Sequence, residues 1–432
     1  MSSVGIMLLF NVDDFSGAEC IIVAVSGGSD SLALLFLLRE YFIYSACEKR
    51  MIAITVDHAL RPESKDEAKY VARLCKSYEI FHEIVVWNGK KPRSSISSIA
   101  RIARYELLCK AAEKYGANVI VTGHTLDDQA ETYIMRSLRR SRRGLAVMPR
   151  VALLQEKFCL LRPLLEVRRL TLQSYLRERK ILWIQDPTND NPSYERVRIR
   201  KYIDEYALIY ADYAVSFAAQ RRRSESERVA ALALKLRMSF LRDQLLFDLS
   251  LIKSADLEDF VVLIAMSAAI MGGREYPSTN RRSLLEFLSK RNSFLRRMTL
   301  SGAMIEMTKN FVRIWREKRN LKSLIVKSAK TAIWDGRYHI INKSDKAVLL
   351  RSPNKVELMD ILRFLDIEDV HFSSLETTCM VCGSSGFDFP VLRVLNNKNI
   401  EIQRIMLPFN RVVSSYDFVM FWVFRIAFSK NR

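Results

Sequence analysis

The sequence predicts an α/β protein: an N-terminal doubly wound parallel sheet, then a helical middle domain and a small α+β C-terminal domain. In the first two hundred residues, short apolar runs alternate with longer amphipathic ones, which is typical of βαβ units. Beyond about residue 199 the sequence becomes helix-like, and from about residue 330 strand-like runs return. We expect domains at residues 1–205, 206–328 and 329–432.

The N-terminal elements follow one another regularly. Strands are expected at residues 20–25, 51–56, 81–86 and 118–122, and helices at residues 31–44, 63–78, 96–115 and 125–139. Parallel sheets of this kind bind ligands beyond the carboxyl ends of their strands. The chemistry is therefore expected just after Val25, Val56 and Thr122.

The later elements are less regular. Residues 202–238 contain no glycine or proline and are rich in Ala, Leu, Arg and Glu, which predicts one long helix. Gly272, Gly273 and Pro277 then separate two further helical stretches. Asp335 and Gly336 form a turn signal between strand-like runs.

Composition restricts the class of protein and of partner. Of the 432 residues, 49% are hydrophobic, which excludes a disordered chain. Lys and Arg number 68 against 48 Asp and Glu, a formal net charge of +20, and this excess favours nucleic acid or an anionic membrane as partner. The sequence has no uninterrupted apolar run of about 18 residues, so a membrane partner is not expected.

Cysteine use and the first residues indicate the compartment. Seven cysteines are scattered among apolar neighbours, as is typical of reduced, buried thiols. Cys379 and Cys382 form a lone CxxC, so zinc binding and redox chemistry are not expected there. Residues 1–10 lack the features of a signal peptide. We therefore expect a cytoplasmic protein.

The six residues after the first strand predict a phosphate site. They are Ser26, Gly27, Gly28, Ser29, Asp30 and Ser31. Adjacent glycines let successive N–H groups point into one concavity, and the start of the next helix adds the positive end of its dipole. The lysine-bearing GxxxxGK[ST] pattern is absent. A carboxylate beside phosphates requires a bridging cation, so Asp30 is a candidate Mg²⁺ ligand.

A second motif begins the helix after the fourth strand. Asp127 and Asp128 lie four and three residues before Glu131, so that these carboxylates share one helix face. Carboxylates at a helix start interact favourably with its dipole. At the mouth of a phosphate site, however, they would repel a phosphate-bearing ligand. The pattern therefore predicts a cation between them.

These motifs resemble a known family. Residues 26–31 are similar to the SGGxDS loop of the N-type ATP pyrophosphatases, the PP-loop superfamily. Further matching stretches are residues 56–62, 103–105, 123–132, 162–165, 186–189 and 194–200. In this order and spacing, residues 20–200 resemble the tRNA(Ile)-lysidine synthases.

The resemblance implies an activity and roles for individual residues. These enzymes use ATP to adenylate the C2 oxygen of the wobble cytidine in tRNA(Ile) with anticodon CAU, and the ε-amine of L-lysine then displaces AMP. The product is lysidine, and the tRNA changes from methionine to isoleucine identity. By resemblance, ATP binds at residues 26–31, Asp128 and Glu131 hold lysine, and Asp30, Arg104 and His124 are catalytic. The expected cofactors are ATP and Mg²⁺.

Arginines cluster after the second motif and near the end of the first domain. Charge runs are often solvated surface, but acidic residues do not balance these, so phosphate contact is the better interpretation. The candidate tRNA-binding residues are Arg139, Arg140, Arg142, Arg143, Arg196, Arg198 and Arg200. The family usually has a glycine-rich loop where residues 139–144 are arginine-rich, so this loop departs from the resemblance.

Two other functions stay open. A tRNA sulfurtransferase of the same superfamily would thiolate cytidine at C2, but it would generally need paired cysteines near ATP, and Cys75 and Cys109 are unpaired in sequence. A non-catalytic tRNA-binding protein would need only a vestigial nucleotide site. The presence of Asp30, Asp128 and Glu131 together favours the enzyme.

Overall fold

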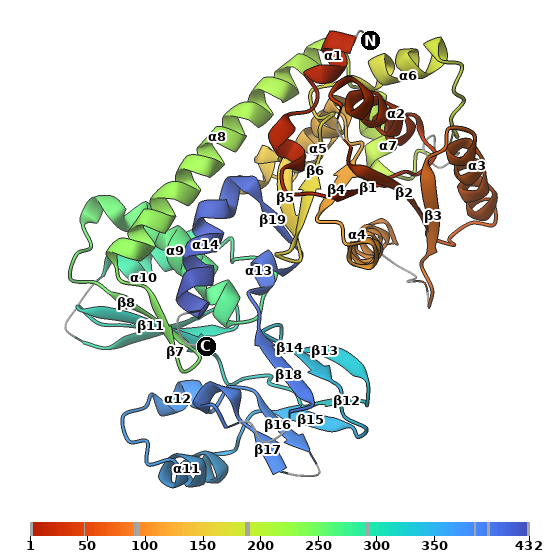
Figure 1. The fold of residues 1–432 in the computed structure, drawn as a ribbon. Coiled ribbons are helices and arrows are strands. Elements are labelled where there is room, and N and C mark those ends of the chain that lie inside the picture. Colours follow the sequence, from red (N-terminus) through yellow and green to blue (C-terminus); the bar gives the residue numbers. More distant parts are fainter. Residues whose placement is uncertain are drawn as a thin grey trace. The chain divides into compact units, whose positions relative to one another are not determined.

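The structure is a computed structural model that describes residues 3–46, 48–89, 91, 96–185, 191–290, 294–383, 386–394 and 398–429. Residues 186–189, which contributed to the resemblance, lie outside this set. The chain divides into two compact units, Met1–Arg223 with Val412–Tyr416 and Ser224–Arg411 with Asp417–Arg432 (Figure 1). Every helix in the described residues is too short or too polar to cross a membrane.

The first unit is built on a seven-stranded sheet with the order β19-β5-β6-β4-β1-β2-β3. β1 pairs in parallel with both β2 and β4, β2 pairs in parallel with β3, and β4 with β6. β5 and β19 are antiparallel. The predicted parallel sheet is therefore confirmed. The strands are β1 (Cys20–Ala24), β2 (Arg50–Asp57), β3 (Phe81–Val86), β4 (Val119–Thr122), β5 (Val151–Leu154), β6 (Phe158–Leu161) and β19 (Val412–Ser414).

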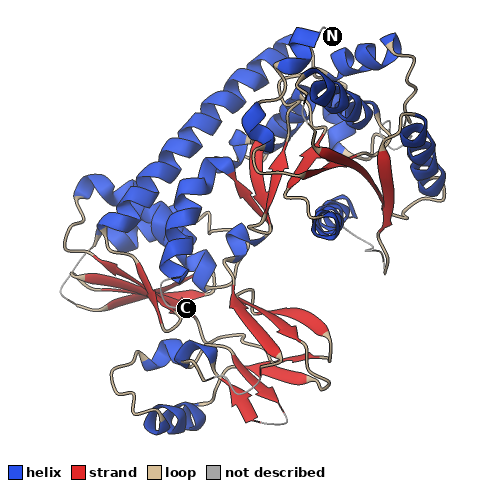
Figure 2. Cartoon of the chain, viewed as in Figure 1, coloured by secondary structure: helices blue, strands red, loops and turns tan. Residues whose placement is uncertain are grey.

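Helices cover both faces of this sheet (Figure 2). The helices up to residue 235 are α1 (Ser3–Met7), α2 (Ser29–Tyr44), α3 (Ser64–Ser77), α4 (Ile96–Tyr115), α5 (Leu126–Leu138), α6 (Arg169–Glu178), α7 (Glu195–Arg200) and α8 (Glu205–Lys235), the last of which continues into the second unit. Because side chains alternate along a strand, Val23 joins the apolar cluster under α2, α3 and α6, whereas Ile22 joins the cluster under α4. The strand order reverses between β1 and β4, so their carboxyl ends form the crevice where such folds bind ligands.

Among its described residues, the second unit contains three antiparallel sheets, with the orders β7-β8-β11-β10-β9, β12-β15-β16-β17 and β13-β14-β18. The strands are β7 (Ser239–Leu241), β8 (Gln244–Asp248), β9 (Arg296–Leu300), β10 (Ala303–Met307), β11 (Phe311–Arg316), β12 (Leu324–Val326), β13 (Lys330–Trp334), β14 (Tyr338–Asn342), β15 (Val348–Arg351), β16 (Met380–Gly383), β17 (Gly386–Asp388) and β18 (Ile400–Arg404). The helices are α9 (Leu257–Met271), α10 (Arg281–Ser289), α11 (Lys355–Phe364), α12 (Phe372–Leu375), α13 (Leu407–Asn410) and α14 (Phe418–Ser429).

The predicted helical middle region also contains a five-stranded sheet that the sequence pattern did not reveal. The helices are present, and α9 is almost entirely buried. The missed strands carry charged residues that pair across the sheet: Arg297 on β9 and Arg313 on β11 both donate to the buried Glu306 on β10 (2.8 and 3.3 Å). Charged residues inside such short strands weaken the alternating apolar pattern by which strands are recognised. The boundaries at residues 205 and 328 stay predictions.

Candidate active site

The loop after β1 forms a tight turn at the start of α2. Gly27 has a φ of +86°, a conformation that L side chains rarely adopt, and a Cβ there would also have to displace Ile184 Cδ1 at 2.5 Å, so glycine is strongly favoured. Ser31 Oγ accepts from the Ser26 N–H (3.0 Å) and donates to the Gly28 carbonyl (3.0 Å). Helix α2 begins directly behind this loop, and the first N–H groups of a helix have no partner within it. The turn therefore offers an anion site at a helix N-terminus.

The loop after β4 touches this turn through its backbone. A Cβ on Gly123 would lie 2.7 Å from the Asp30 carbonyl oxygen and 3.2 Å from Ser31 Cα. Because backbone atoms cannot move aside as a flexible side chain can, this position requires glycine. The contact brings the two predicted motifs, residues 26–31 and 123–132, together at the crevice.

Three of the predicted carboxylates meet at one guanidinium, that of Arg169 at the start of α6. Its Nε donates to Asp30 Oδ2 (2.9 Å), its Nη2 to Asp128 Oδ1 (3.3 Å) and its Nη1 to Glu131 Oε1 (3.5 Å). Its backbone N–H donates to Asp127 Oδ2 (2.7 Å). Burial disfavours the cation, but these carboxylates raise the pKa of Arg169. The chain thus supplies a cation of its own among the carboxylates, at a residue that sequence reasoning missed.

Asp128 also belongs to the N-terminal cap of α5. The Thr125 N–H and hydroxyl donate to Asp128 Oδ2 (3.0 and 3.1 Å), and the Asp128 N–H donates back to Thr125 Oγ1 (3.4 Å). This capping box fixes the carboxylate at the helix start. Burial opposes its charge, but the charges of Arg169 and Arg196 lower the pKa of Asp128. Asp128 is therefore ionised at neutral pH.

Glu131 is the most buried of these carboxylates, with 1% of its side chain exposed. Arg200 Nε donates to Glu131 Oε1 (2.7 Å), and Arg196 Nε lies 3.0 Å from Oε2. Among the described residues, Oε2 accepts no hydrogen bond of good geometry. Arg196 Nη2 also donates to Thr132 Oγ1 (2.9 Å). Two arginines expected at tRNA phosphates thus contact the carboxylate cluster, and their tRNA contact stays a prediction.

The other predicted tRNA-binding residues are Arg139, Arg140, Arg142, Arg143 and Arg198. The first four lie at the end of α5 and in the following loop, and Arg198 lies in α7. Arg139 forms an ion pair with Glu195, and Arg198 donates to backbone carbonyls just before α7. The side chains of Arg140 and Arg142 are exposed. These two are therefore the most accessible candidates for phosphate contact.

His124 lies in a basic environment. Its Nδ1 is 3.0 Å from Thr122 Oγ1 at the end of β4. Burial, together with the charges of Arg162 and Arg101, holds the pKa of His124 well below its usual range. The imidazole is therefore neutral at physiological pH.

Arg104 lies on α4, facing the end of β2. Its Nε donates to His58 Nε2 (3.4 Å). Burial, with the charges of Arg104 and Lys91, lowers the pKa of His58 to about 4, so this imidazole is also neutral. Arg101 is on the same helix, three residues before Arg104. The crevice therefore combines carboxylates from α5 with guanidinium groups from α4.

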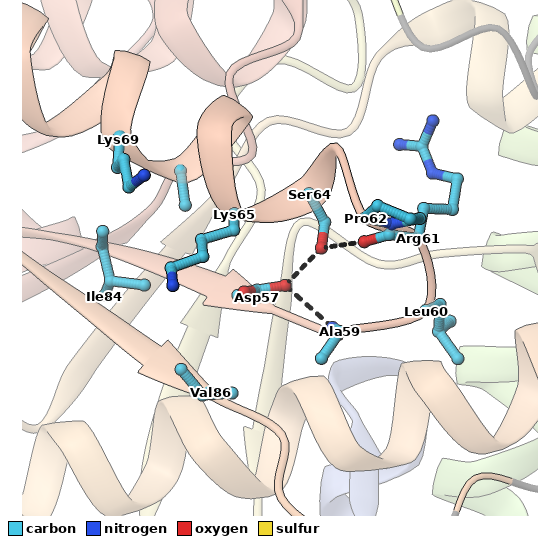
Figure 3. A pocket seen from close by; sticks show the side chains of 11 residues that line it. Asp57, Ala59, Leu60, Arg61, Pro62, Ser64, Lys65, Lys69, Ile84 and Val86 are labelled. Atoms are coloured by element: carbon cyan, nitrogen blue, oxygen red, sulfur yellow. Dashed lines mark hydrogen bonds between the residues drawn. The ribbon is translucent and has the colours of Figure 1, made fainter.

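A pocket of about 700 Å³ lies beside the ends of β2 and β3 and the start of α3 (Figure 3). Its lining includes Asp57, Lys65, Ile84 and Val86. Asp57 Oδ1 accepts from the Ala59 N–H and from the Ser64 hydroxyl (2.8 Å each), so this carboxylate stabilises the loop after β2. None of residues 26–31 lines this pocket, which is distinct from the phosphate turn.

The residues at the turn fit a magnesium ion bound together with phosphates. Asp30 Oδ1 accepts from Ser29 Oγ (2.9 Å), and burial raises the pKa of Asp30 although Arg169 lies beside it. Among the described residues, no group of three or more His, Cys, Asp or Glu side chains could hold an ion alone. Mg²⁺ at nucleotide sites is typically held by one or two carboxylates together with phosphate oxygens, which a single Asp30 satisfies.

Among the described cysteines, Cys75 and Cys109 do not form the pair that a sulfurtransferase would need. Cys75 and Cys109 belong to apolar clusters on opposite faces of the sheet. Burial raises the pKa of these thiols to about 11 and about 12. Cys379 and Cys382 are free thiols in and beside β16, and burial raises the pKa of both. All four are protonated at neutral pH, which disfavours nucleophilic or metal-binding roles.

Comparison with known proteins extends the likeness to the whole chain. Residues 6–206 match the model of the PP-loop domain. A solved U34-tRNA thiolase from Methanococcus maripaludis is 18% identical, covers 51% of this chain and 77% of its own, and has a TM-score of 0.43. A tRNA(Ile)-lysidine synthase of Bartonella quintana is 37% identical over 95% of both chains. One of Brucella anthropi is 38% identical over 97% of this chain and 96% of its own. The chain belongs to the tRNA(Ile)-lysidine synthase family.

Proposed function

We propose that this protein joins L-lysine to C2 of the wobble cytidine in tRNA(Ile) with anticodon CAU, while ATP is cleaved to AMP and pyrophosphate. The observation that carries the proposal is the meeting of the phosphate turn with the α5 carboxylates, where Asp30 and Asp128 share Arg169. A nucleotide site and a cation site in one crevice suit a reaction that activates a carbonyl oxygen and then adds an amine. Family membership supports the same activity.

In the first step the C2 oxygen of cytidine attacks the α-phosphorus of ATP, and the bond to pyrophosphate breaks. The turn at residues 26–31 and the start of α2 hold the leaving pyrophosphate through backbone N–H groups. Arg104 stabilises the negative charge that develops on the phosphoryl oxygens. Asp30 would hold Mg²⁺, which neutralises charge on the phosphates when it is bound.

In the second step the ε-amine of lysine attacks the activated C2, and AMP leaves. Both ammonium groups of lysine suit the carboxylates, and Asp128, with 13% of its side chain exposed, is more accessible than Glu131. Arg169 already contacts the same carboxylates, so bound lysine takes over part of its contacts. The ε-ammonium must lose a proton before attack, and the neutral His124 can relay it.

The test is to incubate the protein with labelled lysine, ATP and total tRNA. Label should enter one isoleucine tRNA only. Label in many tRNAs, or in none, would contradict the proposal. Asp30→Ala should abolish incorporation while tRNA binding survives, and Asp66→Ala, at an exposed position on α3, should leave both unchanged. Full incorporation by Asp30→Ala would overturn the role of the turn.

A further inference from the structure

One face of α8 exposes a row of aromatic side chains. Between 61% and 85% of the surface of each is exposed, and the row consists of Tyr206, Tyr210, Tyr213 and Phe217. At 3.6 residues per turn, the four lie within about 60° of arc. The opposite face of the helix packs into the first unit through buried Leu208 and Val215. Core packing therefore explains the buried face of this segment but not the aromatic row.

The aromatic row begins beside the proposed catalytic carboxylates. The ring of Tyr210 contacts that of Tyr133 on α5, with centroids 6.3 Å apart. Helix α8 also packs on Ala130, the residue before Glu131. Further along α8, Arg222 Nη1 donates to the Arg143 carbonyl (3.5 Å). Helix α8 thus runs from the carboxylate cluster past the arginine-rich loop of residues 139–143, which contacts the side of α8 opposite the row.

The charges near the aromatic row suit an anionic partner. Arg221 and Arg223 are exposed just beyond its C-terminal end, and Arg140 and Arg142 are exposed in the neighbouring loop. In residues 206–217, all described, the single carboxylate is Asp212, outside the arc of the row. A second copy of this chain would bring like charges together at this face, which disfavours self-association. Exposed aromatics beside arginines are typical of surfaces that bind single-stranded nucleic acid.

We propose that the aromatic row stacks on unpaired bases of the tRNA loop that contains the wobble cytidine, while Arg140 and Arg142 contact its phosphates. The identity of the RNA rests on the proposed function. The new element of this inference is the surface to which the tRNA loop binds. Stacking accepts any base, because every base has a π face. The row therefore suits nucleotides that flank the reacting cytidine and holds them beside the crevice.

The experiment compares three double variants at positions 210 and 213: Tyr→Phe, Tyr→Leu and Tyr→Ala. Tyr276→Ala, an exposed tyrosine of the second unit, is the matched control. Affinity for a tRNA(Ile) transcript with anticodon CAU is measured over a range of salt concentrations. The Leu and Ala pairs should each weaken binding about tenfold or more, whereas the Phe pair and the control keep it. The salt dependence should not change in these variants, whereas Arg140→Ala/Arg142→Ala should reduce its slope by about 2.

Three outcomes would overturn the inference. The first is that the Ala double variant binds tRNA as tightly as the wild type. The second is that the Leu double variant binds tRNA as tightly as the Phe double variant. The third is that the Ala double variant keeps its tRNA affinity but loses a self-association that sedimentation detects in the wild type. Lysine incorporation by the wild-type protein is measured separately, so that failure of the inference can be told apart from failure of the proposed function. If the wild type incorporates no lysine and yet binds tRNA through the row, the proposed function fails and the inference stands. If it modifies tRNA and the Ala pair binds normally, only the inference fails.

Discussion

Each unit contains a cluster of buried charges, and the two clusters differ in how completely they are paired. In the second unit Arg337 is fully buried, and each of its nitrogens has a partner: Asp335 Oδ2 (2.7 Å), Asp243 Oδ2 (2.7 Å) and the Thr377 carbonyl (2.5 Å). Arg404 Nε donates to the other oxygen of Asp243 (2.9 Å). Such pairing stabilises one arrangement of the buried charges, because each nitrogen of Arg337 has a partner within the chain.

The cluster in the first unit is paired less completely. Arg169 divides its guanidinium among three carboxylates at 2.9 to 3.5 Å, so that two of these contacts are long. Among the described residues, the buried atoms Glu131 Oε2 and Arg168 Nε have ion-pair contacts without hydrogen-bond geometry, at 3.0 Å to Arg196 Nε and 3.6 Å to Asp127 Oδ2. Buried polar groups are normally satisfied, and an exception calls for an explanation such as a catalytic role, a bound water or an ion. Incomplete pairing, more than the number of charges, therefore distinguishes the Arg169 cluster from the Arg337 cluster.

The largest effect is expected in the second unit. Arg337→Met removes one partner and leaves Asp243 buried with its charge poorly compensated, so the free energy of unfolding should fall by about 3–5 kcal/mol. Urea unfolding measures this loss. Arg228→Met, which breaks an exposed pair with Asp259, should lose less than about 1 kcal/mol. Equal losses in the two variants would show that complete pairing in this cluster adds nothing.

In the first unit the expected effect is on substrate binding. Asp128→Asn removes a charged partner of lysine but keeps the shape of the cap, so KM for lysine should rise about 10- to 100-fold, corresponding to roughly 1.5–3 kcal/mol. Steady-state kinetics with saturating ATP measures it. Glu131→Gln, at the buried centre of three arginines, should reduce kcat and stability more than it raises this KM. An unchanged KM in Asp128→Asn would contradict the assignment.

Arg169 should separate the two substrates. Arg169→Ala leaves the carboxylates uncompensated beside the phosphate turn, so KM for ATP should rise about tenfold through charge repulsion. KM for lysine should not rise, because a competing cation has been removed. Arg169→Lys should restore most of the ATP affinity. A parallel rise in both KM values would show that Arg169 has only a structural role.

The smallest effect concerns pH and involves one histidine in each unit. Burial, with Arg104 for His58 and with Arg313 for His371, lowers the pKa of each to about 4. As pH falls below 6.5, the unfolded chain binds protons that the folded chain does not, so stability decreases. Each should contribute less than about 1 kcal/mol to the loss between pH 6.5 and 5.5, because solvent screens a partly exposed ring. Urea unfolding at pH 6.5 and 5.5 measures this loss of unfolding free energy. The loss should be smaller in His58→Gln and in His371→Gln than in the wild type, and an equal loss would contradict the prediction.

Local patterns were enough to predict the features near the crevice. The parallel sheet, the turn at residues 26–31 and the carboxylates of α5 each depend on neighbours within one strand–turn–helix unit. The five-stranded sheet of the middle region was missed because a charged residue, Glu306, is buried in one of its strands. Its partners, Arg297 and Arg313, lie on the neighbouring strands. Arg169 was missed because it lies about forty positions from Asp128 in the chain, and nothing local to it indicates a partner.

By itself, the sequence determined the fold class, the family and the residue types that ATP and lysine chemistry need, because hydrophobic periodicity and short motifs are encoded locally. The net charge of +20 likewise indicated a polyanionic partner. Only the tertiary structure decided which charges compensate one another. It placed Arg169, Arg196 and Arg200 on Glu131, and it left the aromatic row of α8 uncovered beside them. The physical reason is that ion pairing and exposure depend on distances in space, which sequence separation does not specify.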